Sequence, residues 1–116
     1  MKPVKIDEFS IHDCNFEVGG LKYKVLDLIE ISKDIEPFDL PLQGIDLSVR
    51  PWGENMTIDS YIYHASRMNK ADMKYPIILD NKGYICDGWH RVTKAIIEGR
   101  TIIKAVRLTI MPDVTE

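Results

Sequence analysis

The residues best suited to chemistry form one short run, Asp87-Gly88-Trp89-His90-Arg91. A strand predicted over residues 84–86 ends just before this run, and a helix predicted over about 89–98 begins within it. Gly88 lets the backbone bend sharply and lets a ligand approach closely. The first N–H groups of a helix have no partner inside the helix, and the helix dipole favours an anion at that end. The run therefore predicts a binding site for an anionic group.

Four side chains in and after this run could act on such a group. Arg91 and Lys94 lie three residues apart on one face of the predicted helix, so both could reach a phosphate. His90 could donate a hydrogen bond to a phosphate oxygen or carry a proton. Asp87 could bind magnesium, accept a proton from a substrate hydroxyl, or simply cap the helix. Cations in a first helical turn are unfavourable without an anion nearby, and this favours the anion site over a solvated turn.

Two further places could contribute to the same site. His64 and Arg67 lie one turn apart on a helix predicted from Thr57 or Asp59 through about residue 68. They could converge with Arg91 on the anion, or they could form an exposed polar face. Trp52 lies in a segment rich in glycine and proline, where it could cover a pocket, stack on a base or fill the core.

The remaining elements predict an α+β fold with a small mixed sheet and packed helices. A hairpin is predicted over 15–18 and 21–25, with its turn at Gly19-Gly20. A short helix follows from about 27 to 34, with Leu26, Leu28 and Ile29 on its apolar face. Further strands are predicted over 75–79 and 84–86, and a closing strand over 102–109. Val92, Ala95 and Ile96 should face inward from the helix over 89–98. Residues 35–56 are predicted irregular, with a short helix near 42–47.

Length and composition are consistent with one domain over residues 1–116, with a core over about 20–110 and an N-terminal hairpin extension. The chain has 116 residues, a hydrophobic fraction of 45% and a net charge of −3. Residues 1–60 hold 12 acids and 6 bases, whereas residues 61–116 hold 6 acids and 9 bases. This uneven charge favours a local anion site, which suits a nucleotide better than a DNA duplex.

The chain also lacks several sequence signals. No signal peptide and no membrane-spanning apolar run is visible, so we expect a cytoplasmic protein that does not bind membranes. Its two cysteines form no CxxC pair and no metal site is predicted.

Several of these residues together resemble the ParB/sulfiredoxin superfamily. The resemblance rests on Pro76-Ile77-Ile78-Leu79, the turn at Gly83, the run Asp87-Gly88-Trp89-His90-Arg91, Ala95, Gly99 and Ile103-Lys104-Ala105-Val106. It is strong over 75–108 and extends over about 20–110. That superfamily includes the N-terminal CTP-binding domain of ParB partition proteins, sulfiredoxin and ADP-dependent free serine kinase. The Asp-Gly-x-His-Arg form is most similar to the free serine kinase branch and to small ParB-like proteins of bacteria and phages.

The resemblance implies a small α+β domain that binds a nucleotide (ATP, ADP or CTP), with magnesium, at the start of a helix. It implies phosphate binding at the helix start by Gly88, His90 and Arg91. The other residues predicted to bind phosphates, from their positions in the sequence, are Trp89, Lys94, His64 and Arg67. Glu30 lies near the place where the serine kinase branch has a catalytic glutamate, although a surface glutamate is the alternative. Trp89 replaces the catalytic cysteine of sulfiredoxin, so no sulfinic acid reduction is expected, and sequence-specific DNA binding is not expected either.

Two main functions follow as hypotheses. The first is a small-molecule phosphotransferase, in which Arg91 and His90 hold phosphates and Asp87 or Glu30 accepts the proton of the acceptor hydroxyl. The second is a non-enzymatic module that responds to a nucleotide or phosphate and binds a protein partner, such as a phage host-takeover or anti-defence factor. A ParB-like nuclease or NTPase is a third, weaker alternative.

Overall fold

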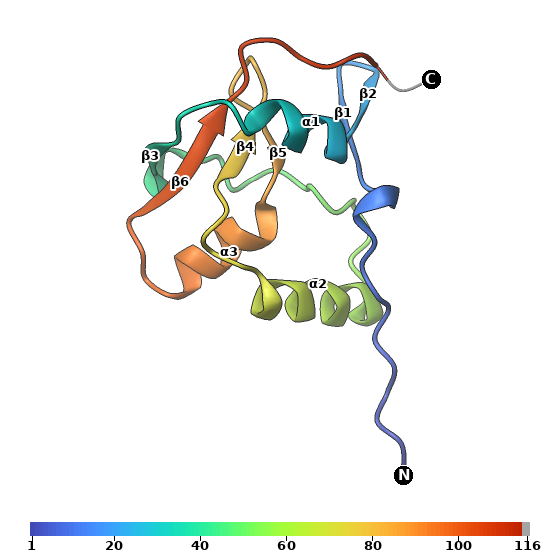
Figure 1. Cartoon of the computed structure of the whole chain (residues 1–116). Helices are drawn as coiled ribbons and strands as arrows, with labels where there is room; N and C mark the ends of the chain where they lie inside the picture. Colours follow the sequence, from blue (N-terminus) through green and yellow to red (C-terminus); the bar gives the residue numbers. More distant parts are fainter. Residues whose placement is uncertain (115–116) are drawn as a thin grey trace.

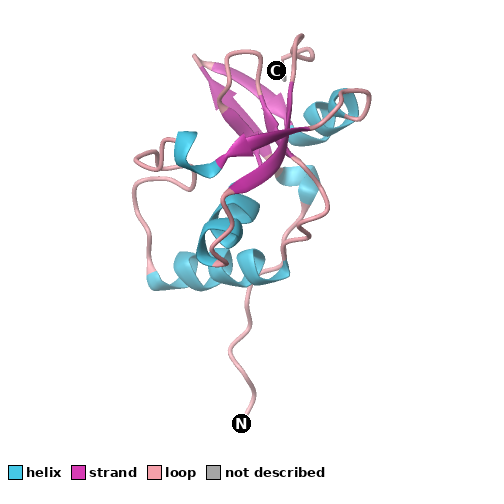
Figure 2. Cartoon of the chain, turned by 90° about the vertical axis from the view of Figure 1, so that its left-hand side faces the viewer, coloured by secondary structure: helices cyan, strands magenta, loops and turns pink. Residues whose placement is uncertain are grey.

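A four-stranded mixed sheet with helices on both faces forms the centre of the fold (Figures 1 and 2). The computed structural model describes residues 1–114, except for the side chain of Asp13. The strand order is β3 (Phe38–Pro41), β6 (Ile102–Arg107), β4 (Ile77–Leu79) and β5 (Ile85–Asp87). β6 pairs antiparallel with β3 and parallel with β4, and β4 pairs antiparallel with β5. The predicted α+β class with a small mixed sheet is confirmed.

The predicted hairpin is also confirmed, as a separate two-stranded sheet. β1 (Asn15–Val18) pairs antiparallel with β2 (Leu21–Lys24) across the two-residue turn Gly19-Gly20. Both glycines have positive φ angles, 57° and 79°, which such a turn requires and which side chains disfavour. The helices are α1 (Val25–Ser32), α2 (Ile58–Lys70) and α3 (Trp89–Ile97), with short 3₁₀ helices η1 (Ile11–Asp13) and η2 (Leu42–Gly44).

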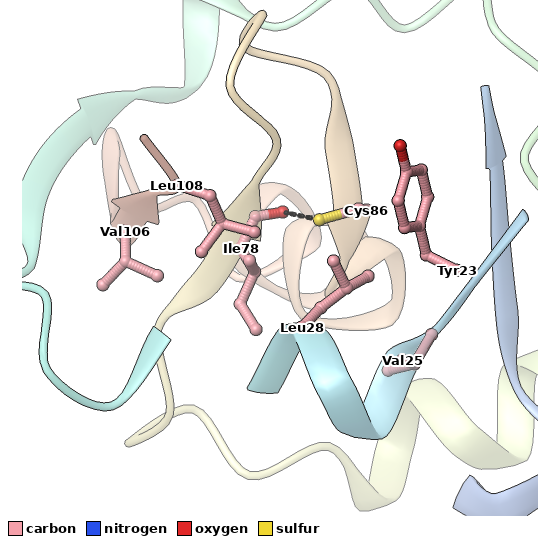
Figure 3. Close-up of a cluster of buried hydrophobic side chains, with 7 residues drawn as sticks. All are labelled: Tyr23, Val25, Leu28, Ile78, Cys86, Val106 and Leu108. Carbon is pink, nitrogen blue, oxygen red and sulfur yellow. Dashed lines mark hydrogen bonds between the residues drawn. The ribbon is translucent and has the colours of Figure 1, made fainter. Parts of the chain in front are cut away.

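Apolar clusters cover both faces of the four-stranded sheet. One cluster joins the sheet to β2 and α1 through Tyr23, Val25, Leu28, Ile78, Cys86, Val106 and Leu108 (Figure 3). The other joins the sheet to η2 and α3 through Leu42, Ile77, Leu79, Val92, Ala95, Ile103 and Ala105. Neighbouring residues of a strand point to opposite faces, so β4 needs apolar side chains at every position because both of its faces are covered.

Some sequence predictions about packing and boundaries are wrong. α1 begins at Val25, and its buried residues are Val25 and Leu28, whereas Leu26 is exposed. In α3, Val92 and Ala95 are buried as predicted, but Ile96 is 38% exposed. The segment predicted as irregular contains β3, an edge strand in which Pro41 is tolerated as the last residue. The helix predicted near 42–47 is only the 3₁₀ turn η2.

Helix α2 packs beside α3 below the sheet (Figure 1). It begins as predicted at Thr57, whose Oγ1 accepts a hydrogen bond from the Ser60 N–H at 3.1 Å. None of its residues is fully buried, and Ile58 and Tyr61 are 76% and 63% exposed. The half-buried side of α2 carries His64 and Arg67 instead, so the helix contributes polar side chains to the region next to α3. No helix within residues 1–114 combines the length and apolar composition needed to span a bilayer.

Candidate functional site

The turn from β5 into α3 has the sharp bend that the sequence predicts. Gly88 has φ 116° and ψ 16°, a left-handed conformation that favours glycine. A Cβ atom at this position would lie 2.5 Å from Cγ2 of Ile77 in β4. Glycine is therefore required here by the packing of the turn on the sheet. The Ile77 side chain fills the space that a side chain at position 88 would need. Packing against Ile77, and not the expected close approach of a ligand, is therefore the main reason for a glycine at this position.

Arg91 is a structural anchor in this turn. Its Nη1 donates to the backbone carbonyls of Tyr75 at 2.9 Å and Pro76 at 2.7 Å, and its Nη2 donates to Oδ2 of Asp87 at 2.7 Å. The Arg91 side chain is only 14% exposed. The fold therefore neutralises this first-turn cation with Asp87, so its position alone does not require a bound anion. The guanidinium holds Asp87 in place and fixes the start of α3 to the segment before β4.

Lys94 also serves the fold. Its Nζ donates to the carbonyls of Asn69 at 3.1 Å and Ala71 at 3.2 Å, where α2 ends. A lysine at this end satisfies carbonyl groups that have no helical partner and complements the negative end of the dipole. Lys94 lines neither cavity beside the turn, so the prediction that it joins Arg91 on one phosphate is wrong.

Three aromatic rings, from Trp52, His64 and His90, stack next to the turn. Nδ1 of His64 lies 2.8 Å from Nε2 of His90, so one ring nitrogen donates a hydrogen bond and the other accepts it. The Trp52 ring stacks on both imidazoles, with centroid distances of 4.3 Å to His64 and 4.7 Å to His90. Trp52 therefore covers the histidine pair. The fold brings His64 and His90 together although 26 positions separate them in the chain.

Burial and neighbouring cations keep this histidine pair neutral near pH 7. Desolvation first, and then the charges of Arg67, His64 and Arg91, lower the pKa of His90 from 6.5 to about 3. Desolvation and Arg67 also lower the pKa of His64. A neutral His90 can donate or accept a hydrogen bond, but it contributes no positive charge to an anion site.

The histidine pair should make the stability of the protein depend on pH. The His90 imidazole has a pKa of 6.5 when exposed and about 3 in the fold, so the unfolded chain binds more protons between these values. The free energy of unfolding should therefore fall as the pH drops below 6.5. Because the ring is partly exposed, we expect a loss of about 1 kcal/mol between pH 7 and pH 5. Urea unfolding of wild type and His90→Gln at both pH values measures it. An equal loss in both proteins would contradict this role of His90.

Two cavities flank the turn and share one wall. The larger has a volume of about 640 Å³ and lies between η1, β1, the segment 49–52 and β5. The smaller has a volume of about 290 Å³ and lies between the C-terminal half of α2, the segment after it and the start of α3. The shared wall consists of Phe9, Arg67, Asp87, Gly88 and His90. The predicted site residues Asp87, Gly88 and His90 thus stand where the two cavities meet.

Arg67 is the cation of this shared wall that no acid neutralises. Its Cζ lies 3.6 Å from the centre of the Phe9 ring and 5.9 Å from that of Tyr63. Over residues 1–114, no hydrogen bond and no ion pair engages its guanidinium. Arg67 and Arg91 line the same small cavity, which is one of the two arrangements that the sequence left open, but only Arg67 has its donors available for a ligand.

Other predicted residues lie outside the site or in less central positions. The Glu30 side chain is 75% exposed on α1, pairs with Lys33 at 2.8 Å and lines neither cavity. The fold does not bring Glu30 close enough to act with Asp87. Trp89 lines the larger cavity only. Cys86 donates to the Ile78 carbonyl at 3.2 Å, and burial raises the pKa of its thiol to about 12, so it is an inert core group (Figure 3).

Three residues that sequence reasoning did not single out line the cavities. Lys70 lines the smaller one, and its spacing of three residues from Arg67 on α2 is a signal that could have found it. Arg50 lines the larger one and lies two residues before Trp52. Phe9 lines both, and no pattern in the N-terminal sequence indicates this.

Comparison with protein-family models, with curated proteins and with solved structures gives no match to this chain. The side chains described for residues 1–114 contain no group of three or more His, Cys, Asp or Glu that could hold a metal ion by themselves. The chemistry of the site therefore has to be inferred from its own geometry.

Proposed function

We propose that this chain binds the phosphates of a nucleotide at the shared wall and transfers the terminal phosphoryl group to a hydroxyl acceptor, as a domain of the ParB/sulfiredoxin type. The proposal is supported chiefly by Arg67, which has no acidic partner in the described structure. Arg67 lines the junction of the two cavities together with the neutral His90. An arginine with free donors suits a phosphate group, which accepts two parallel hydrogen bonds from its guanidinium.

The smaller cavity suits the nucleotide. Its volume of about 290 Å³ is at the lower end for a ligand site, enough for phosphates but small for a complete nucleotide. Arg67, Lys70 and Arg91 line it together with the carboxylates of Asp72 and Asp87. Tyr75 stands at this cavity with 57% of its surface exposed, so its ring offers a stacking partner for a base that extends outward.

Asp87 suits the acceptor side of the reaction. Arg91 holds its Oδ2, whereas its Oδ1 has no hydrogen-bond partner within residues 1–114. Asp87 lines both cavities, so one oxygen can face a hydroxyl group while the residue stays fixed. The carboxylate can accept the hydroxyl proton, and phosphoryl transfer depends mainly on such positioning and on charge stabilisation. One carboxylate combined with nucleotide phosphates is also a donor set that suits magnesium, which would neutralise phosphate charge.

A non-enzymatic module that binds a protein partner is the second candidate. It is favoured by the outer face of α2, where Ile58, Tyr61 and Ile62 are all exposed. An exposed apolar group on one helix face is a common feature of protein interfaces. The same nucleotide site would then regulate partner binding instead of catalysing transfer.

The proposal predicts that nucleotides stabilise the fold. A thermal-shift panel of ATP, ADP, CTP, GTP and pyrophosphate, each with and without magnesium, should contain at least one ligand that raises the melting temperature. At a concentration of about 100 times its Kd, a ligand that binds only the native state adds about 2.7 kcal/mol, or roughly 10 °C for a domain of this size. The corresponding nucleoside without phosphates is the control and should have little effect. A panel without any stabilising phosphate ligand would contradict the nucleotide site.

A further inference from the structure

The larger cavity runs along the edges of two strands. All four residues of β1, Asn15–Val18, line it, and so does every residue from Tyr84 to His90, a stretch that contains β5. Side chains of a strand alternate between two faces, so a cavity over one face of a sheet is lined by every second residue. Lining by consecutive residues indicates that this cavity faces the backbone edge of each strand.

The edge of β5 is available for pairing. β5 is the last strand of the four-stranded sheet, and its only strand partner within residues 1–114 is β4. No other backbone hydrogen bond from this part of the chain reaches Ile85–Asp87. An edge strand presents a row of N–H and C=O groups, which are the recognition elements for an added strand. β1 forms the opposite wall of the cavity.

We infer that the larger cavity binds an extended, acidic polypeptide segment as an added strand on the edge of β5, with β1 as the opposite wall. Phe16, Val18 and Ile85 provide apolar contacts for alternate side chains of the segment.

Arg50 and Arg67 line this cavity and, within residues 1–114, pair with no acid. Its acidic lining residues are Glu17 and Asp87, and Asp87 is neutralised by Arg91. The excess of positive charge favours a partner with Asp or Glu.

Two further points define this partner. The N-terminal arm of a second copy is not an acidic segment, because Lys2 and Lys5 balance Asp7 and Glu8. The segment would also be the phosphoryl acceptor, with its hydroxyl side chain beside Asp87. That part of the inference rests on the proposed function, whereas binding of the segment does not.

Peptide selection tests the inference. Random eight-residue peptides displayed on phage are selected against the immobilised full-length chain, and the best binder is synthesised with one N-methyl group at each backbone position in turn. Selected peptides should have β-branched residues at alternate positions and at least one acid. An added strand directs every second N–H group toward β5, so N-methylation should weaken binding about tenfold at alternate positions and little between them. No enrichment, an N-methyl profile without a period of two, or peptides with helical apolar spacing would overturn the inference.

Substitution of two exposed cations distinguishes peptide binding in the larger cavity from nucleotide binding in the smaller one. Arg50 lines the larger cavity alone, and Lys70 lines the smaller one alone. Arg50→Gln should weaken the selected peptide about threefold to tenfold and leave nucleotide affinity unchanged, while Lys70→Gln should do the reverse. Peptide binding with the period-two profile, but without any nucleotide binding, would support the groove and contradict the proposed function alone.

Discussion

Replacing Arg91 with alanine should lower the free energy of unfolding by about 3 kcal/mol. The guanidinium donates to two backbone carbonyls and to Asp87, and both members of that ion pair are largely buried, with side-chain exposures of 14% and 24%. Removing one partner of such a pair leaves the carboxylate and the carbonyls without donors. Urea denaturation of Arg91→Ala and wild type at pH 7 measures the difference.

Two variants calibrate this result. Lys104 forms an exposed ion pair with Asp39 on the sheet, and Lys104→Gln should cost less than about 1 kcal/mol. Arg91→Lys should recover only part of the stability, because an ammonium group cannot serve acceptors spread over the width of a guanidinium. If Arg91→Ala is as stable as wild type, Arg91 is not the anchor of this turn.

Replacing Arg67 with glutamine should weaken nucleotide binding about 10-fold to 150-fold. This corresponds to the loss of a charge-assisted contact of about 1.5–3 kcal/mol. The fold should persist, since over residues 1–114 Arg67 makes only ring contacts, with Phe9 and Tyr63. Calorimetric titration with the best ligand of the thermal-shift panel provides the affinity.

Arg100→Gln is the matched control for Arg67→Gln. It removes the same charge from a residue that pairs with Glu98 and lines neither cavity. Nucleotide affinity should be unchanged in this control, which separates a contact from a general charge effect. Equal affinities of Arg67→Gln and wild type would contradict the assignment of Arg67.

The fold class and the turn were predictable because their signals are local. Gly19-Gly20 defines the hairpin, Thr57 caps α2, and Gly88 separates β5 from α3. The strand β3 was missed because Pro37 before it and Pro41 at its end indicate irregular structure, and its pairing with β6 depends on residues about 60 positions away. Local propensity contains no information about such a partner.

The roles within the site were less predictable, because they depend on which side chains neutralise each other. The sequence places Arg91 and Lys94 near the start of α3 and Arg67 near the end of α2. Only the tertiary structure shows that Arg91 pairs with Asp87 and Lys94 with the end of α2. Of these three cations, Arg67 is the one whose donors have no hydrogen-bond partner within residues 1–114. The stack of Trp52 on two histidines was not predictable either, because it depends on a loop and two helices.

The proposed site for nucleotide phosphates is the wall shared by the two cavities. The most direct measurement is a titration of ¹⁵N-labelled protein with the best nucleotide while the His90 imidazole and Arg67 guanidinium resonances are followed by NMR. Both sets of signals should shift with one binding curve, and the pKa of His90 should rise from its value of about 3 as the anion stabilises the protonated ring. Saturable nucleotide binding that leaves both sets of signals unchanged would contradict the account.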